Sequence, residues 1–452
     1  MENSAQNNLI VKLKSTEDLQ TFLQEVLQMA KNEGATDACV TINQEKGFGI
    51  DVRMSEVETL AFHEARNAGV TVYFGQRQGS ASSTDVSPDA LISTVRAACN
   101  IAKASAQDPC FGLADRDLVD NNIPELELCH PWDIAPKEAI EQAQDCEKKA
   151  FAIDSKINNS DGVSLSTYTF CNGYADSYGR NFVSNSSMHS MSCSLIATEN
   201  STMQRDYAFT CARNNQDLAS SSVVANLAGQ RVLDRLGARQ INTQTIPVMF
   251  SSRVSASLIS SFVSAIGGSN QYRRNSFLLG AQGSQVFPKG INIYERPRIK
   301  GALGSASFDA EGVATRDNVF VADGVVNQYV MGSYSARRLG LKTTANSGGV
   351  FNLTVEPTAG DFKDLLTQMN RGFLVTEMMG QGVNILTGDY SRGACGFWVE
   401  NGEIQFPVEG VTIAGNLKDM FAGIIAIGSD WDVNRATRCG SILIKKLMVA
   451  GD

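Results

Sequence analysis

Histidine is the residue that metal-dependent hydrolases and acid–base enzymes use most often, and this chain of 452 residues contains three of them. They are His63, His130 and His189, and no two of them have the spacing of metal ligands on one helix. Nothing in the sequence brings a catalytic partner near any of the three. We interpret each as a surface or structural histidine, while a site that folding assembles from all three stays geometrically open.

Motifs for nucleophiles and phosphate binding are incomplete. The segment GDYSRG (388–393) places its serine one position out of register for a G-x-S-x-G elbow. The segment RRLGLKTT (337–344) ends like a phosphate-binding loop but lacks the glycine that should begin it. No spacing forces Asp309, Glu311 and Asp317 into a catalytic pair, so we interpret them as exposed charges of turns and strand edges.

The ten cysteines are scattered singly along the chain, and no C-x-x-C pair is present. This usage is typical of small buried hydrophobic residues in a reducing compartment. We therefore expect neither a disulfide framework nor a structural zinc site.

The composition argues against nucleic acid binding and against a membrane-spanning segment. The formal charge is −9 at pH 7 and no run of Lys or Arg exceeds two residues, which argues against nucleic acid binding. Apolar runs such as FAGIIAIG (421–428) are too short to cross a membrane. The first 14 residues lack the pattern of a secretory signal, so we expect a cytoplasmic protein.

The elements that must position any site begin with an amphipathic helix, which starts at the N-cap Ser15 and ends at Gly34. A second helix starts at Pro88 after the N-cap Ser87. Between them, alternating residues predict successive short strands at 38–42, 49–54, 57–62 and 69–75. We assign residues 1–110 to an amino-terminal domain of helix, strands and helix.

Residues 111–238 are predicted to form an aperiodic connector and a strand-rich middle segment, with helices at about 136–152 and 223–236. Residues 239–452 form a β-rich domain in which ADG (322–324) and ENG (400–402) are hairpin turns. No repeat of fixed period is visible. The fold class is therefore α+β, with a mixed α/β amino-terminal region followed by a large, mainly antiparallel β C-terminal domain.

The segment SASLISSFVSAIGG (255–268) follows a predicted strand at 245–250 and has helical periodicity with two distinct faces. One face is apolar, and the other consists almost wholly of uncharged serine, which is unusual for a helix face in water. The apolar positions are Leu258, Ile259, Phe262, Val263 and Ile266, and the serines are Ser257, Ser260, Ser261 and Ser264. We expect the apolar face to be buried and the serine face to border solvent or a cleft.

Two long segments are specific enough to identify a family: FDAEGVATRDNVFVADGVVNQYVMGSYSARRLGLKTTANSGG (308–349) and MGQGVNILTGDYSRGACGFWVENGEIQFPVEGVTIAGNLKDM (379–420). With GSASSTDVSPDAL (79–91) and MQRDYAFTCAR (203–213), they make the whole chain resemble the TldD/PmbA family of bacterial peptidase subunits. Within this family, the chain is more similar to the PmbA type, also called TldE.

The resemblance implies a heterodimeric metalloprotease that acts on small or unfolded peptides, in which only the TldD-type subunit carries the zinc motif H-E-x-x-x-H. At the matching positions this chain has Ser260, Ser261 and Ala265 in place of the histidine, the glutamate and the second histidine. Serine hydroxyls are weak ligands for zinc and cannot replace the general base. Cys439, in a Cys-Gly pair, matches the family's cysteine ligand, and we predict that it carries no metal.

The resemblance therefore predicts a non-catalytic subunit that binds no cofactor and pairs with a zinc-bearing TldD-type paralogue. One alternative is an independent peptidase, for instance one using Cys439 or Cys395 with a histidine brought close by folding. Another is a homodimeric peptide-binding or scaffold protein.

Overall fold

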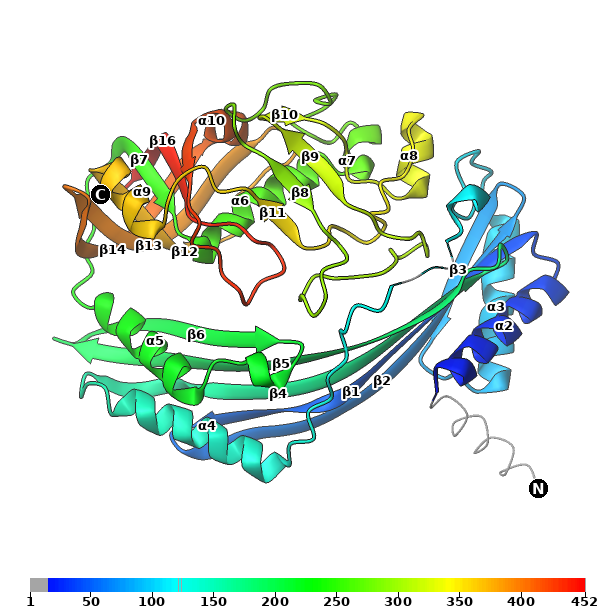
Figure 1. The fold of residues 1–452 in the computed structure, drawn as a ribbon, viewed down its shortest axis with the longest axis horizontal. Helices are drawn as coiled ribbons and strands as arrows, with labels where there is room; N and C mark the ends of the chain where they lie inside the picture. Colours follow the sequence, from blue (N-terminus) through cyan, green and yellow to red (C-terminus); the bar gives the residue numbers. More distant parts are fainter. Residues whose placement is uncertain (1–14, 121, 123, 452) are drawn as a thin grey trace.

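A long curved β-sheet lies opposite a β-barrel in the computed structural model, which describes residues 15–120, 122 and 124–451 (Figure 1). Residues 1–14, where the sequence shows no secretory signal, lie outside the described residues. The combination of helices with largely antiparallel sheets confirms the α+β class. None of the helices in the described part of the chain is long and apolar enough to span a lipid bilayer.

The curved sheet has six antiparallel strands in the order β3-β2-β1-β4-β5-β6. They are β1 (Asp37–Arg53), β2 (Glu56–Phe74), β3 (Arg77–Ser83), β4 (Ile157–Asp176), β5 (Asn181–Glu199) and β6 (Thr202–Ala212). Four helices accompany them: α2 (Thr16–Asn32), α3 (Pro88–Ala104), α4 (Pro136–Phe151) and α5 (Ser221–Asp234). These helices confirm the four that the sequence predicts before residue 240.

The sheet is built from two copies of one pattern. The first copy runs α2-β1-β2-β3-α3 and the second runs α4-β4-β5-β6-α5, and β1 pairs with β4 antiparallel at the centre. The two halves are therefore related by an approximate two-fold axis through the middle of the sheet. In the described residues, one short 3-10 turn, Arg116–Leu118, lies in the connection from α3 to α4. Another, Asn215–Asp217, lies between β6 and α5.

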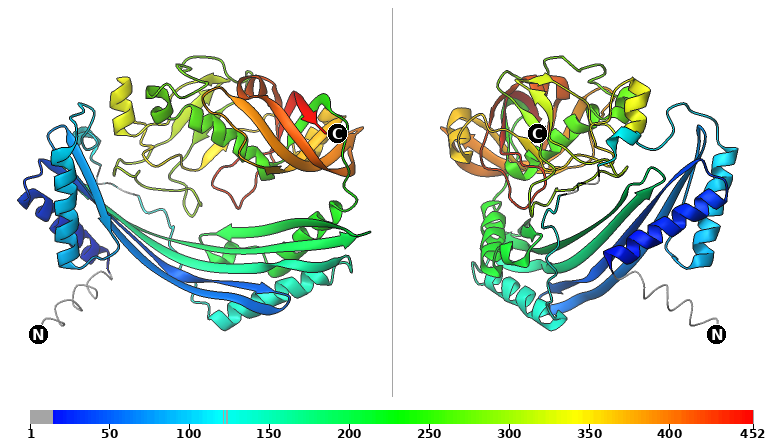
Figure 2. Two further views of the ribbon diagram at one scale, coloured as in Figure 1. Left: turned by 180° about the vertical axis from the view of Figure 1, so that it is seen from behind. Right: turned by 45° about the vertical axis from the view of Figure 1, so that its right-hand side comes forward.

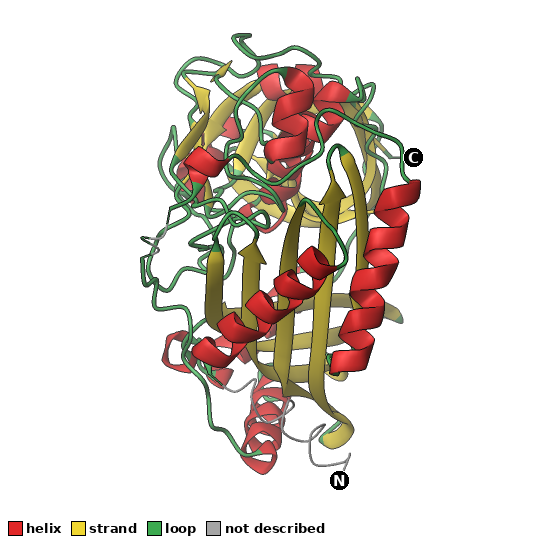
Figure 3. Ribbon diagram, turned by 90° about the vertical axis from the view of Figure 1, so that its right-hand side faces the viewer, coloured by secondary structure: helices red, strands yellow, loops and turns green. Residues whose placement is uncertain are grey.

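All four helices pack on the convex face of the sheet, one pair at each end (Figures 1 and 3). Val40 and Ile42 of β1 are buried against α2 and α3, whereas Ile50 and Val52 of the same strand are buried against α4 and α5. These residues share one face because strand side chains alternate with a period of two. The opposite, concave face is left free to look toward the barrel.

The prediction of four short strands between residues 38 and 75 is wrong, because β1 and β2 each join two of them. The polar residues 43–47 do not form a turn, since they pair with β2 on one side and with β4 on the other. Gly47 permits this continuity: a Cβ atom there would lie 2.0 Å from the carbonyl oxygen of Thr167 on β4. A glycine inside a strand often marks such a close approach.

The C-terminal part forms a barrel in the strand order β14-β13-β12-β7-β16-β15, closed by pairing of β14 with β16. Its strands are β7 (Gln244–Phe250), β12 (Gly372–Met379), β13 (Asp389–Glu400), β14 (Glu403–Asn416), β15 (Ile424–Ile427) and β16 (Ile442–Ala450). A small sheet, β10-β9-β8-β11, adds β8 (Ile293–Glu295), β9 (Asn318–Ala322), β10 (Val325–Val326) and β11 (Leu353–Val355). The helices are α6 (Ser252–Ala265), α7 (Gly268–Tyr272), α8 (Ser333–Leu339), α9 (Phe362–Met369) and α10 (Leu417–Ala422).

Both predicted hairpin turns are confirmed in this part of the chain. Asp323 and Gly324 connect β9 to β10, and Asn401 and Gly402 connect β13 to β14, all four with positive φ. Two successive residues with positive φ suit the right-handed twist of adjacent strands. Viewed from behind, the barrel covers the concave side of the sheet along much of its length (Figure 2).

Candidate functional site

The helix α6 carries Ser260, Ser261 and Ala265, which the family resemblance is expected to align with a zinc motif, and it begins directly after β7. Its first backbone N–H groups need acceptors outside the helix. The N–H of Ser252 donates to Oγ of Ser441 at 3.1 Å, and that hydroxyl donates to Oδ2 of Asp430 at 2.7 Å. The start of α6 is thus tied to the segment that contains Cys439.

Ser261 and Ala265 lie one turn apart on the same side of α6, and Ser260 lies about 100° around the helix from Ser261. Ser260 is exposed and its hydroxyl donates to the carbonyl of Ala256 at 2.9 Å, whereas the half-buried Ser261 donates to the carbonyl of Ser257 at 3.1 Å. Ala265 is fully buried. The two hydroxyls therefore satisfy backbone carbonyls of their own helix, a common local use of serine.

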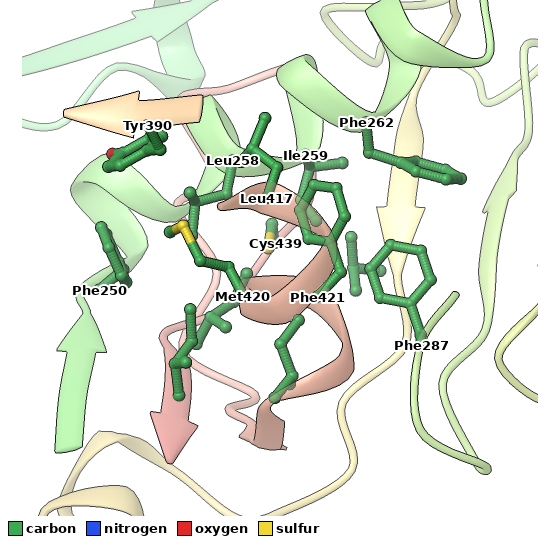
Figure 4. Packing of buried hydrophobic residues seen from close by; sticks show 14 of the residues in the cluster. Phe250, Leu258, Ile259, Phe262, Phe287, Tyr390, Leu417, Met420, Phe421 and Cys439 are labelled. Atoms are coloured by element: carbon green, nitrogen blue, oxygen red, sulfur yellow. The ribbon is translucent and has the colours of Figure 1, made fainter. Parts of the chain in front are cut away.

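Cys439 lies on the apolar side of α6, among Leu258, Ile259 and the side chains of α10 (Figure 4). Only 2% of its surface is exposed, and its thiol donates to the carbonyl of Gly440 at 3.4 Å. Burial raises the pKa of this thiol to about 12. A thiol with so high a pKa is a poor nucleophile at neutral pH, because nucleophilic attack requires the thiolate.

The predicted division of α6 into two faces is confirmed on its packed side. Phe262 makes edge-to-face contacts with Phe287, at 4.9 Å between ring centroids, and with Phe421, at 6.0 Å. Leu258, Ile259 and Phe262 are each no more than 1% exposed. This side of the helix is part of the largest apolar core of the C-terminal domain.

The histidines lie elsewhere. His63 on β2 is 3.8 Å from a carboxylate oxygen of Glu45, and Nε2 of His130 lies 2.9 Å from the carbonyl oxygen of Glu127. His189 is buried, with its ring nitrogens 2.9 Å from Oγ1 of Thr167 and 2.9 Å from the carbonyl oxygen of His130. Burial lowers the pKa of His189. These contacts indicate structural roles, as the sequence predicts.

The cysteines of the described chain do not combine with histidines or carboxylates into a catalytic or metal-binding group. All ten cysteines are free thiols, and none of the polar contacts of the three histidines is to a thiol. Burial also raises the pKa of Cys395. Within the described ranges, no three side chains of His, Cys, Asp or Glu form a group that could bind a metal ion.

One carboxylate is placed differently from the expectation. Asp309 was expected to be an exposed turn charge, and this is wrong, because it is only 2% exposed. Its carboxylate accepts hydrogen bonds from the backbone N–H groups of Glu311, Val313 and Ser347 at 2.9 to 3.0 Å. Burial and the neighbouring charge of Glu311 raise its pKa to about 6. The carboxylate organises the loop around it.

Asp309 also borders a cavity of about 380 Å³ between the concave face of the sheet and the loop at 305–310, which the sequence does not reveal. Most of its lining side chains are neutral hydroxyls and amides, with one guanidinium, that of Arg213. The polar lining residues include Thr41, Asn43, Asn172, Tyr174, Ser184, Ser186, Ser305 and Ser307. Such a lining offers neutral hydrogen-bond donors and acceptors beside the guanidinium of Arg213 and the carboxyl of Asp309, and the neutral groups suit the amide groups of a peptide.

An ion-pair network fixes the barrel to the sheet beside α6. Asp206 of β6 binds Arg253 of α6 through two contacts, at 2.5 and 3.2 Å, and is 3.6 Å from Arg235 at the end of α5. Arg235 also binds Glu377 of β12 at 2.5 Å. The helix α6 is therefore anchored directly to the curved sheet.

Comparison with known proteins gives a consistent result over the whole chain. Three consecutive domains described for the PmbA/TldA metallopeptidases match it: domain 1 at residues 40–102, the central domain at residues 129–236 and the C-terminal domain at residues 243–451. The Metalloprotease PmbA of Escherichia coli O157:H7 is 42% identical over 425 residues, which are 94% of this chain and 94% of that protein.

Two further relatives extend the comparison. The Metalloprotease PmbA homolog of Haemophilus influenzae is 39% identical over 449 residues, covering 99% of each chain. The crystal structure of TldE from Thermococcus kodakarensis has a TM-score of 0.81 at 18% identity, and the match covers 95% of this chain and all of that one, 100%. At this identity, the structural similarity concerns the fold.

Proposed function

Because this chain belongs to the PmbA/TldD metallopeptidase family, we propose that it is the PmbA (TldE)-type subunit of a heterodimeric metalloprotease of the cytoplasm. In this proposal, the chain binds no zinc itself, pairs with a zinc-bearing TldD-type subunit and contributes part of the surface that holds small or unfolded peptides. The single observation that carries the proposal is the family match along the chain. The proposal adds that Ser260, Ser261 and Ala265 of α6 stand at the positions of the zinc motif.

The donor chemistry of the described residues does not fit a catalytic zinc ion. Zinc sites use imidazole, thiolate or carboxylate donors that converge on one point. Here the hydroxyls of Ser260 and Ser261 donate to backbone carbonyls, and the thiol of Cys439 is surrounded by apolar side chains. We therefore assign no step of hydrolysis to residues of α6 in this chain.

The cavity on the concave face supports a role in holding peptide. A peptide presents alternating N–H donors and C=O acceptors, and the hydroxyls and amides of this cavity are complementary to both. Peptides of varied sequence share only these backbone groups. The neutral polar groups of the lining are therefore suited to binding without strong selection of side chains.

The proposal is tested by assaying three samples: this chain alone, a TldD-type relative encoded in the same genome, and their mixture. We expect the two to co-purify, zinc to be found only in samples that contain the TldD-type subunit, and chelator-sensitive peptide cleavage to require that subunit. Chelator-sensitive cleavage by this chain alone would overturn the proposal. A cleavage activity of this chain that thiol alkylation abolishes would instead favour the independent peptidase with Cys439 or Cys395.

The role of the cavity is tested in the mixture with two substitutions on one strand. Asn43→Trp places a large side chain in the lining, whereas Glu45→Trp, two residues further and on the same face of β1, lies outside the lining. We expect Asn43→Trp to raise KM for peptides at least about tenfold, the effect of losing roughly 1.4 kcal/mol of binding energy. Equal KM values for the two variants would show that the cavity does not bind the peptide substrate.

A further inference from the structure

A second cavity, of about 270 Å³ and hereafter the arginine pocket, lies at the edge of the curved sheet where β6 ends. Three arginines line it: Arg213 directly after β6, and Arg435 and Arg438 in the loop between β15 and β16. This loop descends from the barrel toward the sheet (Figure 1), and Oδ1 of its Asn434 accepts a hydrogen bond from the N–H of Cys211 at 2.9 Å. Three cations around one small cavity stand out in a chain whose formal charge is −9.

Two of these arginines, Arg213 and Arg438, form no ion pair within the described part of the chain. The guanidinium of Arg213 donates to the carbonyls of Ser187, at 3.0 Å, and Leu303, at 2.6 Å, and its Nε is buried without a hydrogen bond. That of Arg438 lies over the ring of Trp431, 5.1 Å from its centroid. Burial lowers the pKa of Arg213, as expected for a cation that leaves water without a counter-charge. An anionic ligand would supply the missing negative charge.

The acidic side chains near the pocket leave these two charges available. Asp432 accepts hydrogen bonds from the N–H of Asn434 at 2.9 Å and from Nε of Arg435 at 3.1 Å, so it neutralises Arg435 and fixes the loop. Asp217 belongs to the lining, but it is exposed and forms no ion pair in the described structure. Guanidinium groups held in this way can bind a carboxylate through charge-assisted hydrogen bonds.

The arginine pocket continues the cavity on the concave face. Arg213 lines both, and the loop at 301–310 contributes residues 301–303 to the pocket and residues 305–310 to the cavity. The cavity crosses β1, β4 and β5 and reaches the end of β6, a distance of three strand spacings or about 14 Å. An extended peptide covers this distance with about four residues. A peptide held in the cavity can therefore place one of its ends in the arginine pocket.

We propose that the arginine pocket binds the C-terminal carboxylate of a peptide whose backbone crosses the cavity on the concave face. This inference rests on the proposed function, in which that cavity holds peptides of varied sequence. The C-terminal carboxylate is the anion that such peptides share, and Arg213 and Arg438 supply the positive charge that it needs. Val433, 70% exposed, and Trp431, 38% exposed, offer apolar surface in the pocket to the side chain of the last residue.

The test measures the binding of N-terminally fluorescein-labelled Ala-Ala-Ala-Ala-Leu to the full chain by fluorescence anisotropy. The peptide with a free C-terminal carboxylate should bind at least about tenfold more tightly than the same peptide with a C-terminal amide, and added salt should reduce the difference. An amidated peptide that ends in glutamate should bind as weakly as the amide of the leucine peptide. Equal affinities of acid and amide, recovery of affinity by the glutamate side chain, or no binding of either leucine peptide would overturn the proposal.

Two variants separate the pocket from a general loss of charge. Arg438→Gln should reduce the preference for the free carboxylate to less than about threefold, whereas Arg371→Gln should preserve it. Arg371 is a matched control, because it also lies over a tryptophan ring, that of Trp398 at 5.3 Å, and belongs to neither cavity lining. An unchanged preference in Arg438→Gln would refute the assignment.

The outcome is distinguishable from that of the peptidase proposal, because binding is measured without a TldD-type subunit. Peptide cleavage by the mixture of the two subunits, together with equal binding of acid and amide, would refute only the contact with the C-terminal carboxylate. A preference for the acid that Arg438→Gln abolishes, without cleavage by the mixture, would support the contact and refute the peptidase proposal.

Discussion

Asp206 is the charge on which the junction between the sheet and the barrel depends most, and we expect Asp206→Asn to destabilise the protein strongly. The side chain is 3% exposed and forms a two-pronged contact with Arg253 of α6. Burial alone would raise the pKa of this carboxyl, but hydrogen bonds and charge from Arg253 outweigh burial and hold the pKa below its usual value.

The expected loss of stability depends on which carboxylate partners Arg235 and Arg253 retain in Asp206→Asn. Removing one partner of a buried ion pair costs about 3–5 kcal/mol, because the other charge stays buried without compensation. Arg235 retains Glu377 at 2.5 Å, so only Arg253 loses its carboxylate partner. Arg253 is 17% exposed at its side chain, which lets water replace part of the lost interaction. We therefore expect the low end of that range, about 3 kcal/mol in the free energy of unfolding.

The assay is urea unfolding followed by circular dichroism, with Asp161→Asn as the matched control. Asp161 pairs with Arg205 on the same sheet, but the two side chains are 38% and 62% exposed, and an exposed pair contributes only about 0–1 kcal/mol. Because the pKa of Asp206 is depressed in the folded state, its contribution is complete above the unfolded value of about 3.9 and is lost as pH falls through the folded value. The difference between wild type and Asp206→Asn should shrink below that pH. If Asp206→Asn costs no more than Asp161→Asn at pH 7, the reasoning is refuted.

Three further substitutions or modifications probe other parts of the chain. Leu258→Ala should lower the free energy of unfolding by about 2–5 kcal/mol, because it leaves a cavity, whereas Ser260→Ala on the same helix should change it by less than about 0.5 kcal/mol. Urea unfolding of both variants measures this difference. Equal losses of stability would contradict the division of α6 into a packed and an exposed face. Iodoacetamide at pH 8 should modify the exposed Cys129 and leave Cys439 unmodified until urea is added, as read by mass spectrometry, because the buried thiol has a pKa of about 12. Gly79→Ala should destabilise by about 1–3 kcal/mol, since its Cβ would lie 2.2 Å from the carbonyl oxygen of Ala98; an unchanged urea midpoint would show that α3 moves away freely.

The sequence predicts the helices well and the long sheet poorly, for a physical reason. Helix signals are local: the capping box of Ser15 and Asp18 and the apolar spacing after it lie within a few turns of each other. The sheet depends on pairings between distant residues, such as Cys39 with Asp176. The duplication of the helix–three-strand–helix pattern is equally hidden, because it repeats an arrangement of elements and not a sequence period.

The sequence predicts only those parts of the candidate site that depend on residues close together in the chain. The two faces of α6 and the packing of Cys439 follow from residue types and spacing. The cavity on the concave face does not, because Asn43, Asn172 and Ser307 come together only after β1 and β4 pair and the loop at 305–310 descends onto them. Nor does the sequence show that Asp309 is buried. The donors to its carboxylate are backbone N–H groups, which almost every residue type supplies, so no residue pattern marks them.

The contacts that hold α6 in place lie away from its exposed serine, Ser260. The side chains that hold the helix, Leu258, Ile259 and Phe262, face the core, and Arg253 anchors its start to the sheet. Ser260 contributes only a hydrogen bond within its own helix, at an exposed position. The stability of α6 therefore depends on positions other than Ser260. A substitution of this exposed serine should leave the helix packed against the core and anchored to the sheet.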